Sequence, residues 1–360
     1  MEWVRGEAVG HGSFGTVNLA IPRKQSTRFP PLMAVKSCGS SHSAFLVNEK
    51  SVLQQLSGCP QIIRCFGGDY SFENGEKRFN LLLEYASGGN LAEKVKNSGY
   101  RRLPESDVRR YTRSVLKGLQ YIHENGFVHC DVKLQNILLC NSDQNDVAKI
   151  ADFGLAKKAG EKREKVGFEL RGTPLYMAPE TVSAGEMEPA ADVWSLGCLV
   201  AEMAGSPAWR CTAESDICRL LMRIGVGDEI PEIPGNMSAE GKDFLRRCFL
   251  KDPTKRWTAE MLLNHPFVVD QADDHDLTVP LDDTCEPSTS RSPRGPFDCF
   301  SDLESPCSIT SLPSSEYSWE TDTWSSGELS SSTATAERLR RLATEERPDW
   351  SVSESWVTVR

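Results

Sequence analysis

The sequence predicts an α+β domain over residues 3–268, followed by an acidic, serine-rich tail over residues 269–360. Strand-like and helix-like segments alternate with short turns from Trp3 to Val269, as in a packed mixed domain. The composition then changes, because residues 271–360 hold 18 serines and 18 acidic residues against seven basic ones. Such a segment buries too little apolar surface to offset its chain entropy, so the tail is expected to be mostly disordered.

The predicted elements of the domain follow from local pattern. Apolar and β-branched runs bounded by Gly or Pro predict strands over residues 8–21, 31–38 and 77–86. Apolar side chains at helical spacing predict helices over residues 43–56, 106–126, 192–205 and 238–250. The second of these helices is long and amphipathic, with acidic residues in its first turn and Gly126 as its stop signal.

Charge and cysteine usage exclude several classes of protein. Residues 1–270 carry 34 basic and 33 acidic residues, so neither this body nor the acidic tail offers the basic face of a nucleic-acid binder. The twelve cysteines include no C-x-x-C pair, which argues against a structural zinc site. The sequence shows neither a secretory leader nor an apolar run long enough to cross a bilayer. We therefore expect a reduced, soluble protein of the cytoplasm, the nucleus or both, with no nucleic-acid or membrane partner.

The first chemical motif is the glycine-rich run GHGSFGTV, from Gly10 to Val17, which fits G-x-G-x-x-G-x-V. Glycines let a strand–turn–strand backbone pass close over phosphates and present N–H groups to them. The rival interpretation is a dinucleotide-binding loop, which needs a helix directly after its third glycine. The strand-like TVNLAI follows here, so the sequence favours a loop that covers phosphates between two strands.

The second motif is the strand segment MAVK, which ends at Lys36. A strand lysine at this distance from a glycine-rich loop can reach nucleotide phosphates. Glu49 lies thirteen residues further on, in the predicted helix, and a Lys36–Glu49 ion pair would hold the ammonium group in place. The alternative is an ordinary surface lysine and a solvated helical carboxylate.

The third motif is FVHCDVKLQNILL, which contains H-x-D-x-K-x-x-N at His129, Asp131, Lys133 and Asn136. A carboxylate such as Asp131 can accept a hydroxyl proton and orient the attacking oxygen. A nearby ammonium group offsets charge on a transferring phosphoryl group, and an amide oxygen can bind a hard cation. This spacing is much more specific than the first two motifs.

The fourth motif is ADFG, in which Asp152 stands sixteen residues after Asn136 with a strand-like segment between them. A carboxylate at this position can hold a metal ion that bridges phosphates. The segment GTPLYMAPE follows at residues 172–180, and Asp192 and Arg256 lie in the later segments DVWSLG and DPTKRW.

Taken together, these motifs resemble the eukaryotic protein kinases over residues 3–268, about three-quarters of the chain. The resemblance implies a bilobal fold, with a small β-rich lobe over residues 3–83, a hinge at 84–88 and a larger helical lobe over 89–268. It also implies ATP and Mg²⁺ as cofactors, bound in the cleft between the lobes. The remaining residues, 269–360, form the tail.

The resemblance assigns a role to each motif residue. Lys36 would contact the phosphates and pair with Glu49, Asp131 would orient the substrate hydroxyl, and Lys133 would assist it. The implied magnesium ligands are Asn136 and Asp152, and Thr173 would line the substrate pocket. The implied ATP-binding residues are Val9, Gly10, His11, Gly12, Ser13, Phe14, Gly15, Val17, Ala34, Lys36, Leu83, Glu84, Ala86, Asn90 and Leu138.

Three further features follow from the same resemblance. Leu83 would be the gatekeeper residue at the back of the nucleotide cleft. A hydrophobic spine would include Leu53, His129 and Phe153. A buried ion pair between Glu180 and Arg256 would support the loop that receives the substrate.

Lys133 and Thr173 resemble the serine/threonine branch of the family, and the segments GTPLYMAPE and GHGSFGTV are similar to MEKK-type MAP kinase kinase kinases. HCDVK is similar to a plant subgroup of them. The expected substrates are MAP kinase kinases, in a stress or hormone signalling cascade. Two alternatives are an active kinase with other substrates and a pseudokinase scaffold, although the intact motif residues argue against the scaffold.

Cys130 stands where most kinases have an arginine that pairs with an activation-segment phosphate. A cysteine has no guanidinium group and cannot do this. The activation segment, residues 155–172, contains no Ser, Thr or Tyr, so the phosphate receiver and the phosphate site are absent together. We hypothesise a kinase that is active without phosphorylation of this segment. The alternative is that Cys130 is a neutral packing residue and that regulation lies elsewhere.

The tail contains two Ser-Pro pairs, at Ser292 and Ser305. Such pairs are typical sites of proline-directed kinases, so a downstream MAP kinase acting in feedback is one expected partner. Ser-Pro pairs are also common in disordered tails by chance.

Overall fold

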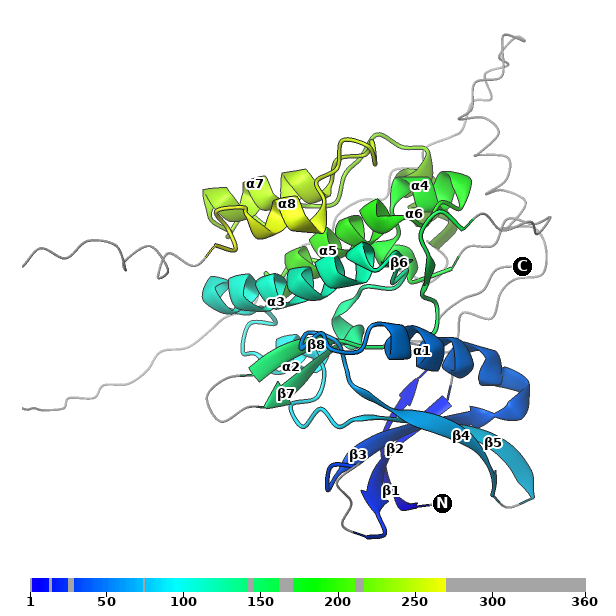
Figure 1. Cartoon of the computed structure of the whole chain (residues 1–360). Helices are drawn as coiled ribbons and strands as arrows, with labels where there is room; N and C mark the ends of the chain where they lie inside the picture. Colours follow the sequence, from blue (N-terminus) through cyan, green and yellow to red (C-terminus); the bar gives the residue numbers. More distant parts are fainter. Residues whose placement is uncertain are drawn as a thin grey trace, which may run out of the picture. The chain divides into compact units, whose positions relative to one another are not determined.

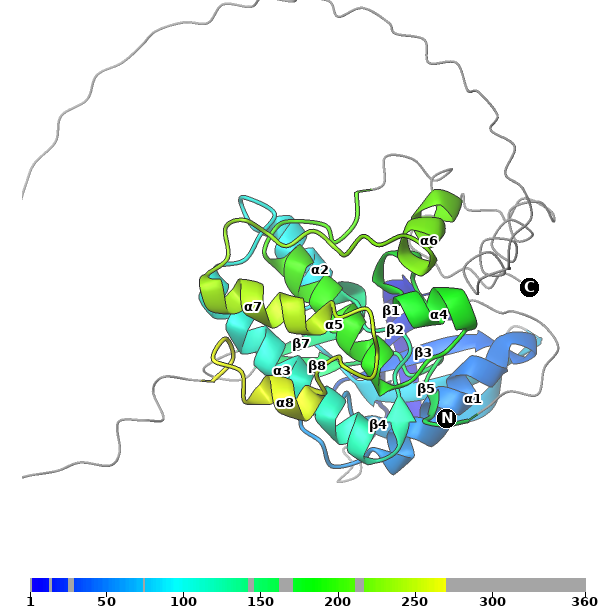
Figure 2. The same cartoon turned by 90° about the horizontal axis from the view of Figure 1, so that it is seen from above.

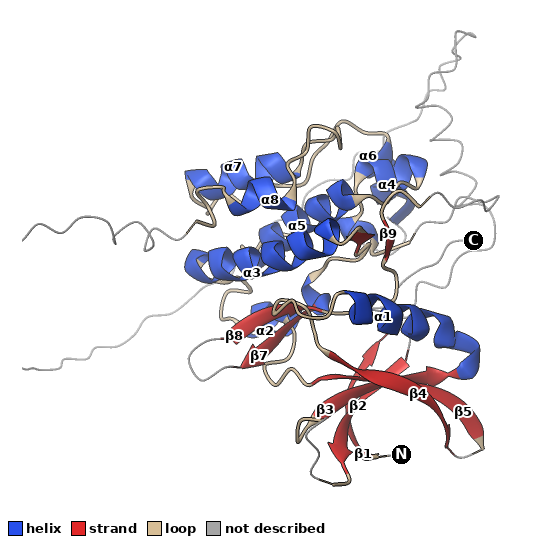
Figure 3. Ribbon diagram, viewed as in Figure 1, coloured by secondary structure: helices blue, strands red, loops and turns tan. Residues whose placement is uncertain are grey.

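The computed structural model describes residues 2–12, 15–24, 29–73, 75–141, 146–161, 171–210 and 217–269. The described part of the first 84 residues builds an antiparallel sheet and one long helix, whereas mainly helices follow (Figures 1 and 3). The predicted α+β, two-lobed fold class is therefore confirmed. The described residues end at Val269, so the rest of the predicted tail lies outside them.

The sheet of the N-terminal lobe has the strand order β1-β2-β3-β5-β4, with every neighbouring pair antiparallel. Its strands are β1 (Trp3–Gly12), β2 (Gly15–Pro22), β3 (Met33–Gly39), β4 (Cys65–Glu73) and β5 (Glu76–Glu84). The sequence-based strands correspond to β1, β2, β3 and β5, whereas β4 was not predicted. The register places Ala34 of β3 opposite Leu83 of β5, so these two small-to-medium side chains lie side by side on the sheet.

Gly15 is required where β2 begins. A Cβ atom at this position would lie 2.1 Å from the carbonyl oxygen of Ser37 on β3, at a backbone φ of 150°. Only glycine permits this close approach of two backbones. The third glycine of the glycine-rich run therefore fixes how tightly β2 packs against the strand that carries Lys36.

Helix α1 (Ser43–Gln55) packs on the sheet and faces the C-terminal lobe (Figure 1). Its buried residues Leu46, Glu49, Val52 and Leu53 recur at helical spacing, which explains why the segment folds as a helix against a sheet. Glu49 is the one charged residue on this buried face, and its partner is described with the site below.

The C-terminal lobe is built around two long helices. They are α3 (Glu105–Glu124), which has acidic residues in its first turn, and α5 (Pro189–Met203), most of which is buried. Figure 2 shows α5 among its neighbours, and α3 and α7 both contact it. The other helices are α2 (Leu91–Asn97), α4 (Pro179–Ala184), α6 (Ile217–Gly225), α7 (Ala239–Cys248) and α8 (Ala259–Leu263). None of the described helices is both long and apolar enough to span a membrane.

The segments between these helices contain short strands and single 3₁₀ turns. Strand β6 (Phe127–Val128) pairs with β9 (Lys157–Lys158), and β7 (Ile137–Asn141) pairs with β8 (Asp146–Ile150). The 3₁₀ turns cover Ser40–His42, Leu134–Asn136 and Pro174–Tyr176. The motif residues from His129 to Asn136 therefore lie between β6 and β7.

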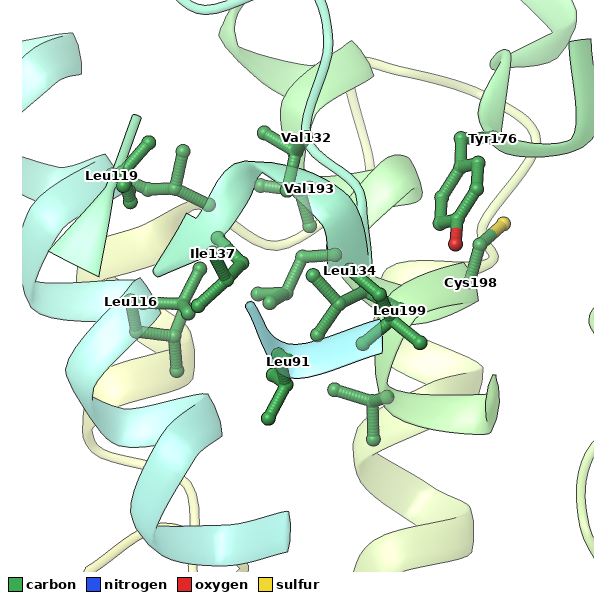
Figure 4. Packing of buried hydrophobic residues seen from close by; sticks show 14 of the residues in the cluster. Leu91, Leu116, Leu119, Val132, Leu134, Ile137, Tyr176, Val193, Cys198 and Leu199 are labelled. Carbon is green, nitrogen blue, oxygen red and sulfur yellow. The ribbon is translucent and has the colours of Figure 1, made fainter. Parts of the chain in front are cut away.

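Apolar side chains anchor the motif loop, residues 129–136, in the core of the C-terminal lobe. Val132, Leu134 and Ile137 are almost fully buried and pack among residues of α2, α3 and α5, including Leu116 and Leu199 (Figure 4). Burying one such side chain stabilises a fold by about 1.5–3 kcal/mol. The loop thus alternates apolar anchors with polar residues, and the anchors fix the positions of the polar residues, which are themselves largely buried.

The predicted ion pair between Glu180 and Arg256 is present and buried. Nη1 of Arg256 lies 2.6 Å from Oε1 of Glu180, and Nη2 lies 3.0 Å from Oε2. The same guanidinium group donates to the carbonyl oxygens of Leu250 and Ala190, each at 2.8 Å. Every guanidinium nitrogen and both carboxylate oxygens therefore have a protein partner, and the pair joins the start of α4 to the loop before α8.

Candidate active site

Asp131 is at the centre of a cluster of polar side chains in the motif loop. Its Oδ1 accepts a hydrogen bond from Thr173 Oγ1 at 3.0 Å, and Lys133 Nζ donates to the same hydroxyl at 3.3 Å. Asn136 Nδ2 donates to the Asp131 carbonyl oxygen at 2.9 Å and also to its carboxylate. The carboxylate thus accepts hydrogen bonds from two side chains, one of them a hydroxyl group, as a base that positions a substrate hydroxyl would.

The protonation of Asp131 and Lys133 reflects their common burial. Burial raises the pKa of Asp131 well above its ordinary value, although the charge of Lys133 opposes this. Burial also lowers the pKa of Lys133, against the attraction of Asp131. A carboxylate with a raised pKa is a stronger base than an exposed one, which suits it to accept a proton near neutral pH.

Lys36 connects the two lobes through two carboxylates. Its Nζ lies 2.8 Å from Oε2 of Glu49 on α1 and 2.9 Å from Oδ1 of Asp152. The predicted Lys36–Glu49 pair is therefore present. Burial alone would lower the pKa of Lys36, but Asp152 and Glu49 outweigh it and the pKa is raised. The ammonium group is charged and held in one place, as a group that binds phosphates must be.

Asn136 and Asp152, the two candidate metal ligands, are neighbours. The N–H of Ala151 donates to the carbonyl oxygen of Asn136 at 2.9 Å, which ties the two segments together. Burial would raise the pKa of Asp152, but Lys36 lowers it overall, so the carboxylate is ionised. Mg²⁺ in phosphate sites takes one or two protein oxygens besides phosphate and water oxygens. A carboxylate and an amide on two segments tied together at this point fit such a site.

His129 and Phe153 pack edge to face, with ring centroids 4.8 Å apart. The Asp131 N–H donates to His129 Nδ1 at 3.2 Å, and His129 Nε2 lies 3.1 Å from the carbonyl oxygen of Ala151. Burial lowers the pKa of His129, so the neutral ring donates from Nε2 and accepts at Nδ1. This ring joins the two motifs, as the predicted spine requires.

The residues predicted to bind ATP are distributed over the sheet and the hinge. Gly10 pairs with Val17 across β1 and β2, and Leu138 of β7 bridges to Asn90 at the start of α2. Val9 and Val17 are at least partly exposed, whereas Ala34 and Leu83 are nearly buried. The backbones of His11 and Gly12 continue β1. Ser13 and Phe14 lie outside the described residues.

Two of the predicted ATP-binding residues use their side chains elsewhere. The Glu84 carboxylate accepts bonds from Lys149 Nζ at 2.7 and 2.8 Å, and Asn90 Oδ1 accepts from the N–H of Glu93 at 2.9 Å as the cap of α2. Ala86, between them, accepts a backbone bond from Gly89. Contact between the hinge and a nucleotide would therefore use backbone groups at these positions.

Cys130 is an uncharged residue in a strained backbone position. Its φ is 67°, in the left-handed region, which costs a non-glycine residue about 1–2 kcal/mol. The Cys130 N–H donates to Asp192 Oδ1 at 3.0 Å, and Asp192 Oδ2 accepts from the His129 N–H at 2.8 Å. Burial raises the thiol pKa well above its usual value. The prediction that Cys130 carries no charge for a phosphate thus agrees with its surroundings.

Asn48 has a role that the sequence analysis missed. Its amide Nδ2 donates to the carbonyl oxygens of Gly154 and Ala156 at 3.1 and 2.9 Å, and to that of Phe153 at 3.4 Å. Asn48 therefore ties α1 to the segment that follows Asp152. The signal was weak, because one asparagine beside Glu49 resembles an ordinary exposed helical residue.

Replacing Asn48 with alanine is expected to lower kcat/KM about fivefold, because the segment after Asp152 loses its link to α1. Amide hydrogen exchange over residues 153–156 should become faster in the variant. Gln54→Ala, an exposed position on the same helix, is the matched control and should behave as the wild type. Unchanged exchange in Asn48→Ala would contradict this role.

Comparison with known proteins identifies the family of this chain. The protein kinase domain model matches residues 3–268. Mitogen-activated protein kinase kinase kinase 20 of Arabidopsis thaliana is 50% identical over the full length of both chains. Mitogen-activated protein kinase kinase kinase 17 of the same plant is 40% identical over 78% of this chain and 73% of its own. The Saccharomyces cerevisiae serine/threonine-protein kinase BCK1/SLK1/SSP31 is 35% identical over 74% of this chain and 18% of its own. The chain therefore belongs to the protein kinase family, as a serine/threonine kinase of the plant MAP kinase kinase kinase type.

Proposed function

We propose that this kinase transfers phosphate from ATP to serine or threonine hydroxyls of MAP kinase kinases. The observation that carries the proposal is the cluster of Asp131, Lys133 and Thr173, in which a buried carboxylate already accepts a hydroxyl hydrogen bond. The relatives support the substrate class, because their names place them one step above MAP kinase kinases.

Each residue of the site has a defined part in this reaction. Asp131 orients the substrate hydroxyl and accepts its proton, while Lys133 offsets the charge that develops beside it. Lys36, fixed by Glu49, holds the phosphates in line with that hydroxyl. Asn136 and Asp152 would hold magnesium, which neutralises the phosphate oxygens when bound.

The second part of the proposal is that this activity does not need phosphorylation of the activation segment. It is supported by the neutral Cys130 and by residues 155–172, whose sequence has no Ser, Thr or Tyr. Control would then act through the amount of protein, its partners or the tail.

The cellular setting is also part of the proposal. We place the kinase in the cytoplasm, the nucleus or both, in a stress or hormone cascade, with a feedback MAP kinase acting on Ser292 and Ser305. These serines and the rest of the predicted tail from residue 270 on lie outside the described residues. Phosphorylation mapping with and without an active MAP kinase tests the feedback, and no modification at either serine would refute it. A fluorescent fusion of the full chain tests the location.

The central test is made on protein from bacteria that is treated with phosphatase and then freed of it. ATP-dependent labelling of a panel of MAP kinase kinases is measured, with Asp131→Asn as the inactive control. We expect labelling of activation-segment hydroxyls in at least one member. Labelling of a general substrate alone would favour a kinase with other substrates. Silence toward every substrate would refute activity without activation-segment phosphorylation.

A further inference from the structure

The residue before helix α5, Glu188, binds the segment that follows Asp152. Its Oε1 and Oε2 accept the N–H of Gly160 at 3.1 and 3.0 Å. Oε1 also lies 3.2 Å from Nζ of Lys157 on β9. The Glu188 carboxylate thus binds the side chain of Lys157 on β9 and the backbone N–H of Gly160 in the turn that follows.

The start of α5 supplies a second carboxylate with a related task. Asp192, one helical turn after Glu188, accepts the backbone N–H groups of His129 and Cys130. Strand β9 pairs with β6, which leads directly into His129. The N-cap residue and the first turn of α5 therefore hold both the loop of Asp131 and the segment after Asp152, through two carboxylates spaced four residues apart.

Lys157 needs a negative partner in this position. Its side chain is only 15% exposed, so its charge is partly removed from water. In kinases that are switched by phosphorylation, a phosphate supplies the negative charge that orders this part of the molecule. Residues 155–172 offer no hydroxyl for such a phosphate, whereas Glu188 already provides an anion.

We infer that Glu188 is a positioning residue, whose carboxylate holds Lys157–Gly160 in the place where other kinases use a phosphate. The inference deepens the proposed activity without activation-segment phosphorylation and depends on it. It also gives that activity a physical cause, because the anion is part of the chain and needs no second enzyme to add it.

The nature of the contact decides what kind of effect to expect. The Glu188 side chain is 44% exposed, so salt screens its attraction to Lys157, and the contact adds little to global stability. Its effect is local, because the contact fixes the conformation of residues 157–160. Loss of the carboxylate should therefore change the rate of catalysis more than the melting temperature.

The test uses the full chain after phosphatase treatment, with a general protein substrate. Glu188→Gln keeps the shape of the side chain but removes its charge, and Glu188→Asp keeps the charge on a shorter stem. Lys157→Met removes the partner, and the double variant Lys157→Met/Glu188→Gln completes a cycle. Glu186→Gln is the matched control, because Glu186 is an exposed carboxylate in the same loop.

Glu188→Gln is expected to lower kcat about tenfold while KM for ATP stays within about twofold. Exchange of the Gly160 amide hydrogen should become faster by a similar factor. Glu188→Asp should recover part of both losses. The double variant should be no slower than the slower single variant, and Glu186→Gln should match the wild type.

Wild-type kcat and exchange in Glu188→Gln would overturn the inference, and so would a fall in kcat with unchanged exchange at Gly160. If the dephosphorylated wild type has no activity toward any substrate, the proposed function fails instead. The exchange comparison still decides the role of Glu188 in that case, because it needs no turnover.

Discussion

Asparagine in place of Asp131 is expected to lower kcat about a thousandfold and, at the same time, to make the kinase domain more stable. The amide cannot accept a proton from the substrate hydroxyl, so the rate falls. It nevertheless fits the same space, because its oxygen can accept from Asn136 and its NH₂ group can donate to the Thr173 hydroxyl. The carboxylate, by contrast, is costly to bury.

The sign of the stability effect follows from the pKa of Asp131. Burial raises this pKa above its value in the unfolded chain, so the folded protein holds the proton more tightly. Stability is therefore lost as pH rises from the unfolded value, about 4, through the raised folded value. Asparagine does not titrate. The gain in melting temperature should be small at pH 5 and larger at pH 7.5, where it should reach about 3 °C.

Steady-state kinetics and calorimetry at these two pH values check both parts. A variant that is inactive but no more stable than the wild type at pH 7.5 would show that Lys133 fully compensates the buried charge. Lys133→Met then provides a control, since loss of the ammonium group should raise the cost of the Asp131 charge and lower the melting temperature.

Methionine in place of Arg256 is expected to destabilise the domain by about 3–5 kcal/mol, because Glu180 is left buried without its partner. The Ala190 and Leu250 carbonyl oxygens lose a donor as well. For a domain of this size the melting temperature should fall by about 10 °C. Activity should fall with it, because Glu180 lies at the end of the segment that carries Thr173.

Two further variants separate the ion pair from general effects of substitution. Lys255→Met removes the neighbouring cation, whose pair with Asp252 is exposed, and should change stability by less than about 1 kcal/mol. The double variant Arg256→Met/Glu180→Leu removes both charges and should be more stable than Arg256→Met alone. An equal loss in the single and double variants would show that packing, not the unpaired charge, sets the cost.

Elements with a strong local pattern are the part of the fold that sequence could predict. Helix α3 has an apolar stripe, an acidic first turn and Gly126 behind it, and the structure ends it at Glu124. Strand β4 was missed because Cys65–Glu73 contains two glycines and an aspartate, and none of its residues is buried. Its place in the sheet depends on pairing with β5, which is a contact between segments and leaves no pattern within the strand itself.

The same distinction applies to the candidate site. Lys36, Asp131, Asn136 and Asp152 occur in motifs whose spacing indicates chemistry, and the structure brings them together. Asn48 and Glu188 bind backbone carbonyl and N–H groups more than 25 residues away in the chain. Every residue carries such groups, so the partner gives no signal in the sequence, and only the fold shows which side chain meets which peptide.

The position of Lys36 between Glu49 and Asp152 has a consequence for chemical probes. An electrophile that acylates lysine attacks the neutral amine, and the raised pKa leaves very little neutral Lys36 near pH 7. Such reagents should label Lys36 slowly while α1 keeps Glu49 in contact with it. Movement of α1 away from the sheet would remove one carboxylate and speed the labelling. The reactivity of a single amine would then report, in solution, where this helix lies.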